Sequence, residues 1–248
     1  IAILLFIFRQ FKLEEPLMDL RVFKFPMFSH AVVLFIIIIM MMFASELILP
    51  VFMQGPMGLT AAAAGLLLLP GSILNGAMSP FMGALFDKVG PKVMMVPATI
   101  ILAATMFMFS NLTADTPQWV IIAGFMLIML SVSATMMPAE TNGLNQLPKH
   151  LYPHGTAVVS TLQPLAGAIG VSVFIGLLNS RQDSYLSSAE NPESQAVITD
   201  AMVYGVESVY FIIFIIAIIA AVMSFFVYRA TPIEDLVPAP DKKDSNNE

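Results

Sequence analysis

The sequence contains no cysteine, which excludes disulfide bonds and metal sites built from thiolates. Charged residues are also scarce, at 11% of the chain, whereas a soluble domain carries about 25%. The formal net charge of −6 excludes the basic surface that nucleic-acid binding requires. Hydrophobic residues make up 58% of the chain, and the mean hydropathy is +0.84. Because such a chain presents too little polar surface to water, we expect a membrane protein with no nucleic-acid partner.

Apolar runs long enough to cross a membrane occur six times along the chain. A helix needs about 20 apolar residues to cross ~30 Å of hydrocarbon. Continuous runs favour helices, because the strands of a membrane barrel alternate between apolar and polar residues. The sequence therefore predicts an all-α polytopic membrane protein with six transmembrane helices. The expected segments are 28–50, 60–86, 93–112, 119–139, 155–178 and 208–228.

The predicted six-helix bundle covers residues 28–230, and both flanking segments are expected to differ from it. Residues 1–27 open with an apolar run, 1–8, that is too short to span a bilayer, and continue as a loop. We interpret this run as the end of a preceding transmembrane helix, which makes the chain a carboxy-terminal fragment of a longer protein. Residues 231–248 are polar and contain proline, which predicts a disordered cytoplasmic tail.

Lysine and arginine lie almost entirely on one side of the expected bundle. The segments 9–27, 87–92 and 140–154 and the tail from 229 hold ten of these eleven residues, and the opposite side holds only Arg181. Loops rich in Lys and Arg stay on the cytoplasmic side. The sequence therefore predicts a multi-pass protein of the cell membrane with a cytoplasmic carboxy terminus.

Polar residues are concentrated in the first, second, fourth and fifth segments. Polar groups inside a membrane face a bundle interior or a water-filled cavity. We therefore expect these four segments to line a cavity and the third and sixth to face lipid. The alternative is that each hydroxyl bonds a carbonyl one turn earlier in its own helix. The residues concerned are Ser45, Ser72, Asn75, Ser79, Ser131, Ser133, Thr135, Ser160, Thr161, Gln163 and Ser172.

Glu46 is the only acidic residue between Phe28 and Phe86. An intramembrane carboxylate is a functional site by default. We therefore name Glu46, together with Asn75 and Gln163, as a candidate proton or substrate site. The alternative is a solvated carboxylate near the outer helix end, because 18 residues of helix after Phe28 span about 27 Å.

Helix-breaking residues occur within the second and fifth segments. Pro70 and Gly71 lie in the second, and Pro164, Gly167 and Gly170 lie in the fifth. Proline frees a carbonyl and permits a kink, and small residues allow close helix packing. These five residues are candidate hinges, although static bundles use the same features.

The sequence shows no arrangement typical of catalysis. His150 and His154 are four residues apart, but Pro148 and Pro153 interrupt that stretch and no third ligand is near, so we expect loop residues rather than a metal site. We find no nucleophile–base pair, P-loop or dinucleotide fingerprint. The sequence therefore predicts neither an enzyme nor a cofactor.

A short polar stretch separates the second and third segments and reads Gly83-x-Leu85-x-Asp87-Lys88-x-Gly90-x-Lys92. It resembles the cytoplasmic loop motif of the major facilitator superfamily, with Pro91 where that motif usually has a basic residue. Residues 50–54, 66–71, 155–160 and 166–170 are similar to the fourteen-helix drug/proton antiporter branch, in particular to bacterial multidrug exporters of the lincomycin-resistance type. The resemblance covers residues 1–230.

The resemblance implies the carboxy-terminal six-helix half of an exporter that exchanges protons for apolar or cationic drugs while its two halves rock. Its implied partners are a drug-like small molecule, protons, the lipid bilayer and the missing amino-terminal half. The Asp87 carboxylate would meet a helix amino terminus of that other half and hold one state closed. The implied latch consists of Gly83, Asp87, Lys88, Gly90 and Lys92.

Two other functions stay open at this point. The first is a metabolite transporter of the same fold with narrow specificity. The scarcity of charged residues in the middle of the membrane argues against sugars or anions as its substrates. The second is a membrane scaffold without transport, for which polar-lined helices and a charged latch would be unusual. Loss of drug efflux in Asp87→Ala, at normal protein level, distinguishes the exporter from the scaffold.

Overall fold

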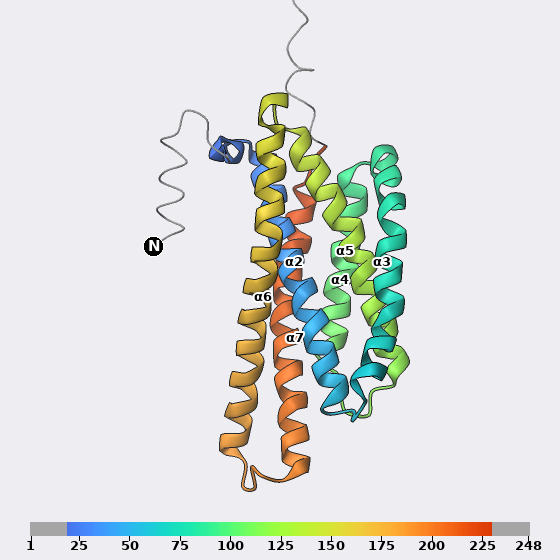
Figure 1. Ribbon diagram of the computed structural model, residues 1–248, viewed down its shortest axis with the longest axis vertical. Coiled ribbons are helices and arrows are strands. Elements are labelled where there is room, and N and C mark those ends of the chain that lie inside the picture. The colour runs from blue at the N-terminus through green and yellow to red at the C-terminus, as the bar shows by residue number, and fades with distance from the viewer. Residues whose placement is uncertain (1–18, 230–248) are drawn as a thin grey trace, which may run out of the picture.

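The computed structural model describes residues 19–229, and six long α-helices form the bundle in this part of the chain (Figure 1). All six are long and apolar enough to cross a membrane, which confirms the predicted all-α fold with six spans. The helix predicted to end in 1–8 and the predicted disordered tail, 231–248, lie outside the described residues. The helices are α2 (Pro26–Gln54), α3 (Ala61–Val89), α4 (Pro91–Phe109), α5 (Gln118–Asn145), α6 (Tyr152–Ser188) and α7 (Gln195–Phe225).

Two 3-10 helices, η1 (Leu20–Lys24) and η2 (Lys149–Leu151), precede α2 and α6. They lie at the upper end of Figure 1, together with the α3–α4 link. The lower end carries the α2–α3, α4–α5 and α6–α7 links.

The helices α6 and α7 are longer than the sequence predicted, and the expected loop 179–207 is mostly helical. Only residues 189–194 connect the two helices, and the rings of Tyr185 and Tyr204 pack with centroids 5.4 Å apart. Hydropathy marks only the part of a helix that lies in hydrocarbon. The 37 residues of α6 extend for about 56 Å, so the polar ends of the pair project beyond the ~30 Å core of a bilayer.

Local residue chemistry accounts for several helix boundaries. Pro26 and Pro91 occupy the first turns of α2 and α4, where the missing N–H of proline leaves no bond unmade. Thr60 caps α3 by accepting a hydrogen bond from the Ala63 N–H at 3.2 Å. Gly90 separates α3 from α4 with φ of 80°, a conformation that favours glycine.

The six helices pack in two layers. The front layer runs α6, α2, α5, α3, with each helix in contact with the next, and α7 and α4 pack together behind it (Figure 1). The main apolar core lies between the layers and includes Ile38 and Phe52 of α2, Phe109 of α4 and Tyr210 of α7. The front layer contains the four helices in which polar residues are concentrated, and the back layer contains the other two. That the front layer lines a cavity stays a prediction.

The exposed surfaces of the two layers differ in chemistry. Along α4 from 93 and α7 from 211, the exposed residues are apolar, as expected for a surface that faces lipid. On α3 and α6, exposed polar residues are interspersed with apolar ones. The polar residues include Ser72, Ser160, Thr161, Gln163 and Ser172. The Ser72, Thr161 and Ser172 hydroxyls donate to carbonyls four residues earlier in their own helices. The amide of Gln163 is too polar for lipid, so the face of α6 around it favours protein or water against it.

Candidate transport site and latch

The residues of the loop motif meet at the upper end of the bundle, where α3 ends and α4 begins. Asp87, Lys88 and Lys92 are exposed, and the Arg229 Nη2 donates a hydrogen bond to the Asp87 carbonyl oxygen at 3.3 Å. This contact holds the chain after α7 against the link. Within residues 19–229, no ion pair involves the Asp87 carboxylate, so the side chain is free to meet another group.

The glycines of the motif have packing and conformational roles. A Cβ placed on Gly83 would lie 2.7 Å from the Met137 Cε of α5, so a larger residue here would displace the end of that flexible side chain. The Gly90 N–H donates to the Phe86 carbonyl at 2.9 Å and closes α3. Pro91 then begins α4, which explains structurally how proline replaces the usual basic residue of the motif. The short turn at Gly90 therefore sets how the part of the motif on α3 lies relative to the part on α4.

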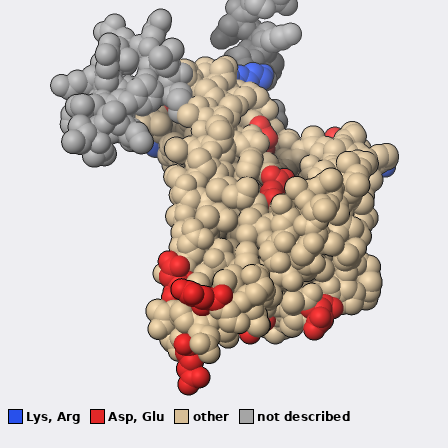
Figure 2. All heavy atoms as spheres, turned by 60° about the horizontal axis from the view of Figure 1, so that its bottom comes forward, with Lys and Arg blue, Asp and Glu red and all other residues tan. Residues whose placement is uncertain are grey.

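Opposite charges gather at opposite ends of the bundle. Figure 2 shows acidic side chains mostly at the lower end and Lys and Arg at the upper end. Further acidic side chains lie in a hollow on the face that this view shows. Within residues 19–229, Arg181 is the only lysine or arginine at the lower end. The lower end carries Asp115, Asp183, Glu190, Glu193 and Asp200, and the upper end carries Arg21, Lys24, Lys88, Lys92, Lys149 and Arg229.

The structure does not gather the candidate proton or substrate residues in one cluster. Glu46 is half-buried on α2, and it lies 20 residues, or about 30 Å, below the start of that helix. Asn75 of α3 donates from Nδ2 to the Met129 carbonyl of α5 at 3.0 Å, so its amide joins two helices. Gln163 is exposed on α6, on the opposite side of the bundle from α3 (Figure 1).

Several hydroxyls that were expected to line a cavity do not do so. Ser45, Ser133 and Thr135 are buried within the bundle. Ser45 bonds the Met41 carbonyl at 2.9 Å, and Thr135 bonds the Ser131 carbonyl at 2.7 Å. For Ser45 and Thr135 the prediction was wrong, because a hydroxyl can bond a carbonyl of its own helix and then pack in a dry core. Ser133 is buried in the same way, but its hydroxyl has no hydrogen-bond partner among the described residues. Ser131 lines a different pocket, described below.

Sequence reasoning missed a polar contact between the two helices of the back layer. Thr99 of α4 and Ser224 of α7 are both buried, and their hydroxyl oxygens lie 2.9 Å apart. Both side chains also bond carbonyls within their own helices. No periodic signal marked this pair, because an isolated hydroxyl in an apolar helix has no recognisable spacing until the partner helix is placed.

The candidate hinge residues lie in unbroken helices and make close contacts. Pro70 and Gly71 are within α3, and Pro164 and Gly167 are within α6. A Cβ on Gly71 would collide with the Phe125 ring, and one on Gly167 would lie 2.9 Å from the Phe43 ring. Close packing thus explains these glycines, as the alternative in the sequence analysis allowed. A hinge role for them stays a prediction.

Gly170 provides a sharp test of close packing. A Cβ there would lie 2.7 Å from the Met40 Cα of α2, so we expect Gly170→Leu to force α6 away from α2 and to cost about 1–3 kcal/mol of stability. Gly176→Leu is the matched control, because nothing lies within 4 Å of that position. Thermal unfolding in detergent should show a lower Tm for Gly170→Leu alone, and equal Tm values for both variants would contradict this packing.

Comparison with known proteins agrees with this architecture. The sequence pattern of the Major Facilitator Superfamily matches residues 4–171. The chain belongs to the major facilitator superfamily. The chain is therefore a membrane-spanning, all-α member of this superfamily, and the predicted resemblance is confirmed.

Among curated relatives, the chain is similar to lincomycin resistance proteins LmrB. It is 44% identical to the protein of Bacillus subtilis over 229 residues, which is 92% of this chain and 48% of that protein. It is 40% identical to that of Listeria monocytogenes over 230 residues, or 93% and 49% of the two chains. A multidrug resistance protein B homolog of Mycobacterium tuberculosis is 24% identical over 170 residues, or 68% and 32%. The chain thus spans about half the length of these first two relatives, as expected for half of a major facilitator transporter.

Proposed function

We propose that this chain is the carboxy-terminal half of a proton-coupled exporter that removes apolar or cationic drugs across the cytoplasmic membrane. The observation that carries the proposal is the similarity to lincomycin resistance proteins over more than nine-tenths of the chain. Transport proceeds as the two halves rock about a site between them, in the manner of the superfamily. The charge difference between the two ends supports a cytoplasmic upper end, because cationic loops stay inside.

The surface chemistry of the front layer supports the proposal that a second half of the transporter packs against it. Among the side chains of the four helices in this layer, the exposed Gln163 amide and the half-buried Glu46 carboxylate need protein or water rather than lipid. The exposed Ser72 and Ser172 hydroxyls already bond carbonyls of their own helices. The back layer has the apolar surface that lipid requires. The central cavity therefore lies between the front layer of this chain and the matching layer of the amino-terminal half.

The loop motif supports a latch at the cytoplasmic end. Asp87 is exposed beside the α3–α4 link, where its carboxylate can meet the positive end of a helix dipole from the other half. A latch of this kind matters only if the contact favours one conformation over the other. Protons, the drug and the amino-terminal half are therefore the partners that this mechanism requires.

A whole-cell assay tests the exporter function. We expect the complete transporter, expressed in cells that lack other efflux systems, to remove ethidium at a rate that a protonophore reduces to that of empty cells. A chain of residues 1–248 alone is the control and should give no ethidium accumulation in energised vesicles, because half of the cavity is absent. Accumulation by that chain alone, or efflux that the protonophore leaves intact, would refute the proposal.

A metabolite transporter is the second candidate. The chain is 23% identical over 174 residues to a protein of Clostridioides difficile named riboflavin transporter RibZ, or 70% of this chain and 38% of that one. Riboflavin uptake without any effect on ethidium or lincosamides would favour this candidate over the exporter.

A further inference from the structure

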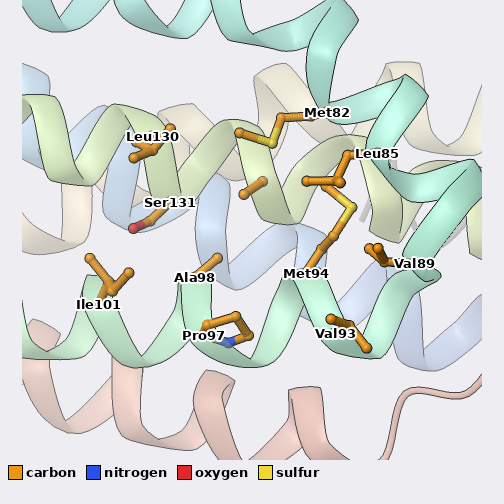
Figure 3. Close-up of a pocket in the computed structure, with 11 residues that line it drawn as sticks. Met82, Leu85, Val89, Val93, Met94, Pro97, Ala98, Ile101, Leu130 and Ser131 are labelled. Atoms are coloured by element: carbon orange, nitrogen blue, oxygen red, sulfur yellow. The ribbon is translucent and has the colours of Figure 1, made fainter.

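An apolar pocket of about 320 Å³ opens between α3, α4 and α5, close to the α3–α4 link (Figure 3). α3 and α4 make few contacts with each other, so the two helices diverge and leave a space above α5. Six of its lining residues are Met82 and Leu85 of α3, Met94 and Pro97 of α4, and Ser131 and Ala134 of α5. The pocket borders α4 of the back layer, so it is separate from the central cavity proposed above.

Ser131 is the polar group of this pocket. Its side chain is 2% exposed, and its Oγ has no hydrogen-bond partner in the described part of the chain. Figure 3 shows Ser131 projecting from α5 toward α4, into the space between the helices. A buried hydroxyl without a partner is unfavourable unless another group supplies one. An occupant with one hydrogen-bond acceptor would satisfy it.

The charges near the pocket disfavour a cationic occupant. Val89 and Val93 line the pocket, and each directly follows an exposed lysine, Lys88 and Lys92. Arg229 adds a third cation, because it bonds the Asp87 carbonyl. The Asp87 carboxylate is the only acidic group in this link, and none of the lining residues is acidic. Three cations against one carboxylate repel a positive charge at the entrance.

We propose that this pocket binds a neutral, apolar small molecule of about two rings that carries one hydrogen-bond acceptor, with Ser131 as the donor. A dry cavity of about 150 Å³ is enough for benzene, and this pocket is about 320 Å³. Met82 and Met94 make the walls adaptable in shape. The ligand enters from the lipid, because Val93 and Ile101 of the lining are themselves exposed on the outer surface of α4.

Benzophenone is a suitable probe, because it is neutral, has two rings and one carbonyl, and inserts into nearby C–H bonds under light. We expect illumination of the complete transporter in detergent to label Met82 or Met94, as read by peptide mass spectrometry. Ser131→Ala should reduce labelling at limiting probe by about two- to tenfold, the usual effect of one hydrogen bond. Ser133→Ala is the matched control, because that hydroxyl is also buried and unpartnered but does not line the pocket.

A second pair of variants tests the pocket by its volume. Ala134→Trp should abolish labelling, because the indole occupies the space. Ala123→Trp should not, because Ala123 is exposed on the same face of α5 about three turns away. If Ala134→Trp does not fold, Ser131→Ala still decides the question, since removing an unpartnered buried hydroxyl does not threaten folding. Unchanged labelling in Ser131→Ala would overturn the role of that hydroxyl and with it the proposal.

Two competitors identify the class of occupant. Unlabelled fluorenone, a neutral ketone, should displace benzophenone, whereas a benzophenone that carries a quaternary ammonium should label at least tenfold less. Equal labelling by the cationic form would overturn the proposed ligand class. Protection by added phosphatidylglycerol but not by fluorenone would overturn it in favour of a lipid chain. These readouts measure binding alone, so failure of the efflux assay leaves their meaning unchanged.

Discussion

Replacement of Asp87 by asparagine should abolish drug efflux while the protein stays folded and at its normal level in the membrane. The side chain is exposed beside the α3–α4 link, so the fold of this half does not depend on its charge. In a closed interface, a carboxylate at a helix amino terminus stabilises by up to about 2 kcal/mol. Its loss would shift the balance between the two conformations of the transporter by up to roughly thirtyfold.

The measurement is ethidium efflux from energised cells, with protein level checked by immunoblot. Asp87→Glu should retain part of the activity, because the longer carboxylate can still reach the helix end. Asp115→Asn is the matched control, since Asp115 is also exposed in a link but at the lower end of the bundle. Normal efflux in Asp87→Asn would contradict the latch and would favour a merely structural role for the loop motif.

Replacement of Glu46 by glutamine should remove the dependence of transport on an imposed proton gradient. Glu46 is the only acidic residue of α2 and is half-buried in the front layer. A carboxylate there can change charge as the cavity opens and closes, whereas an amide of the same shape cannot. We expect efflux to become insensitive to external pH between about pH 6 and 8, and drug binding to persist.

Inverted or reconstituted vesicles allow this measurement, because the pH on each side is set independently. Glu140→Gln is the matched control, because Glu140 is likewise half-exposed but lies near the upper end of α5. An unchanged pH response in Glu46→Gln would falsify the assignment and leave the carrier residue in the other half. A parallel loss in both variants would indicate a shared effect on packing instead.

The loop motif shows how much of the structure the local sequence predicts. The polar stretch predicted a loop over 87–92 between two helices, and the structure shortens that loop to a single turn at Gly90, with φ of 80°, because α3 continues to Val89 and α4 begins at Pro91. The pattern also predicted the family, which the comparison confirmed. The same pattern could not predict the bond from Arg229 to the Asp87 carbonyl, because those residues are brought together only by the packing of α7 against α4.

The hydroxyl residues show where sequence reasoning failed. Ser45 and Thr135 resemble Ser72 and Ser172 in sequence, since each lies in an apolar helix and each bonds a carbonyl four residues earlier. The first two are buried and the last two are exposed. Nothing within one helix distinguishes them, because burial depends on which neighbouring helix covers the face.

The sequence by itself determined that this chain is an all-α membrane protein and that it has six membrane-spanning helices. Those properties follow from hydropathy and from the cost of leaving backbone groups unbonded in lipid, and both act within single segments. Only the tertiary structure decided which polar groups are buried, how far α6 and α7 extend, and that α3 and α4 diverge to leave the pocket beside Ser131. These features depend on side-chain packing between helices distant in sequence, where a single glycine or phenylalanine sets how closely two helices approach.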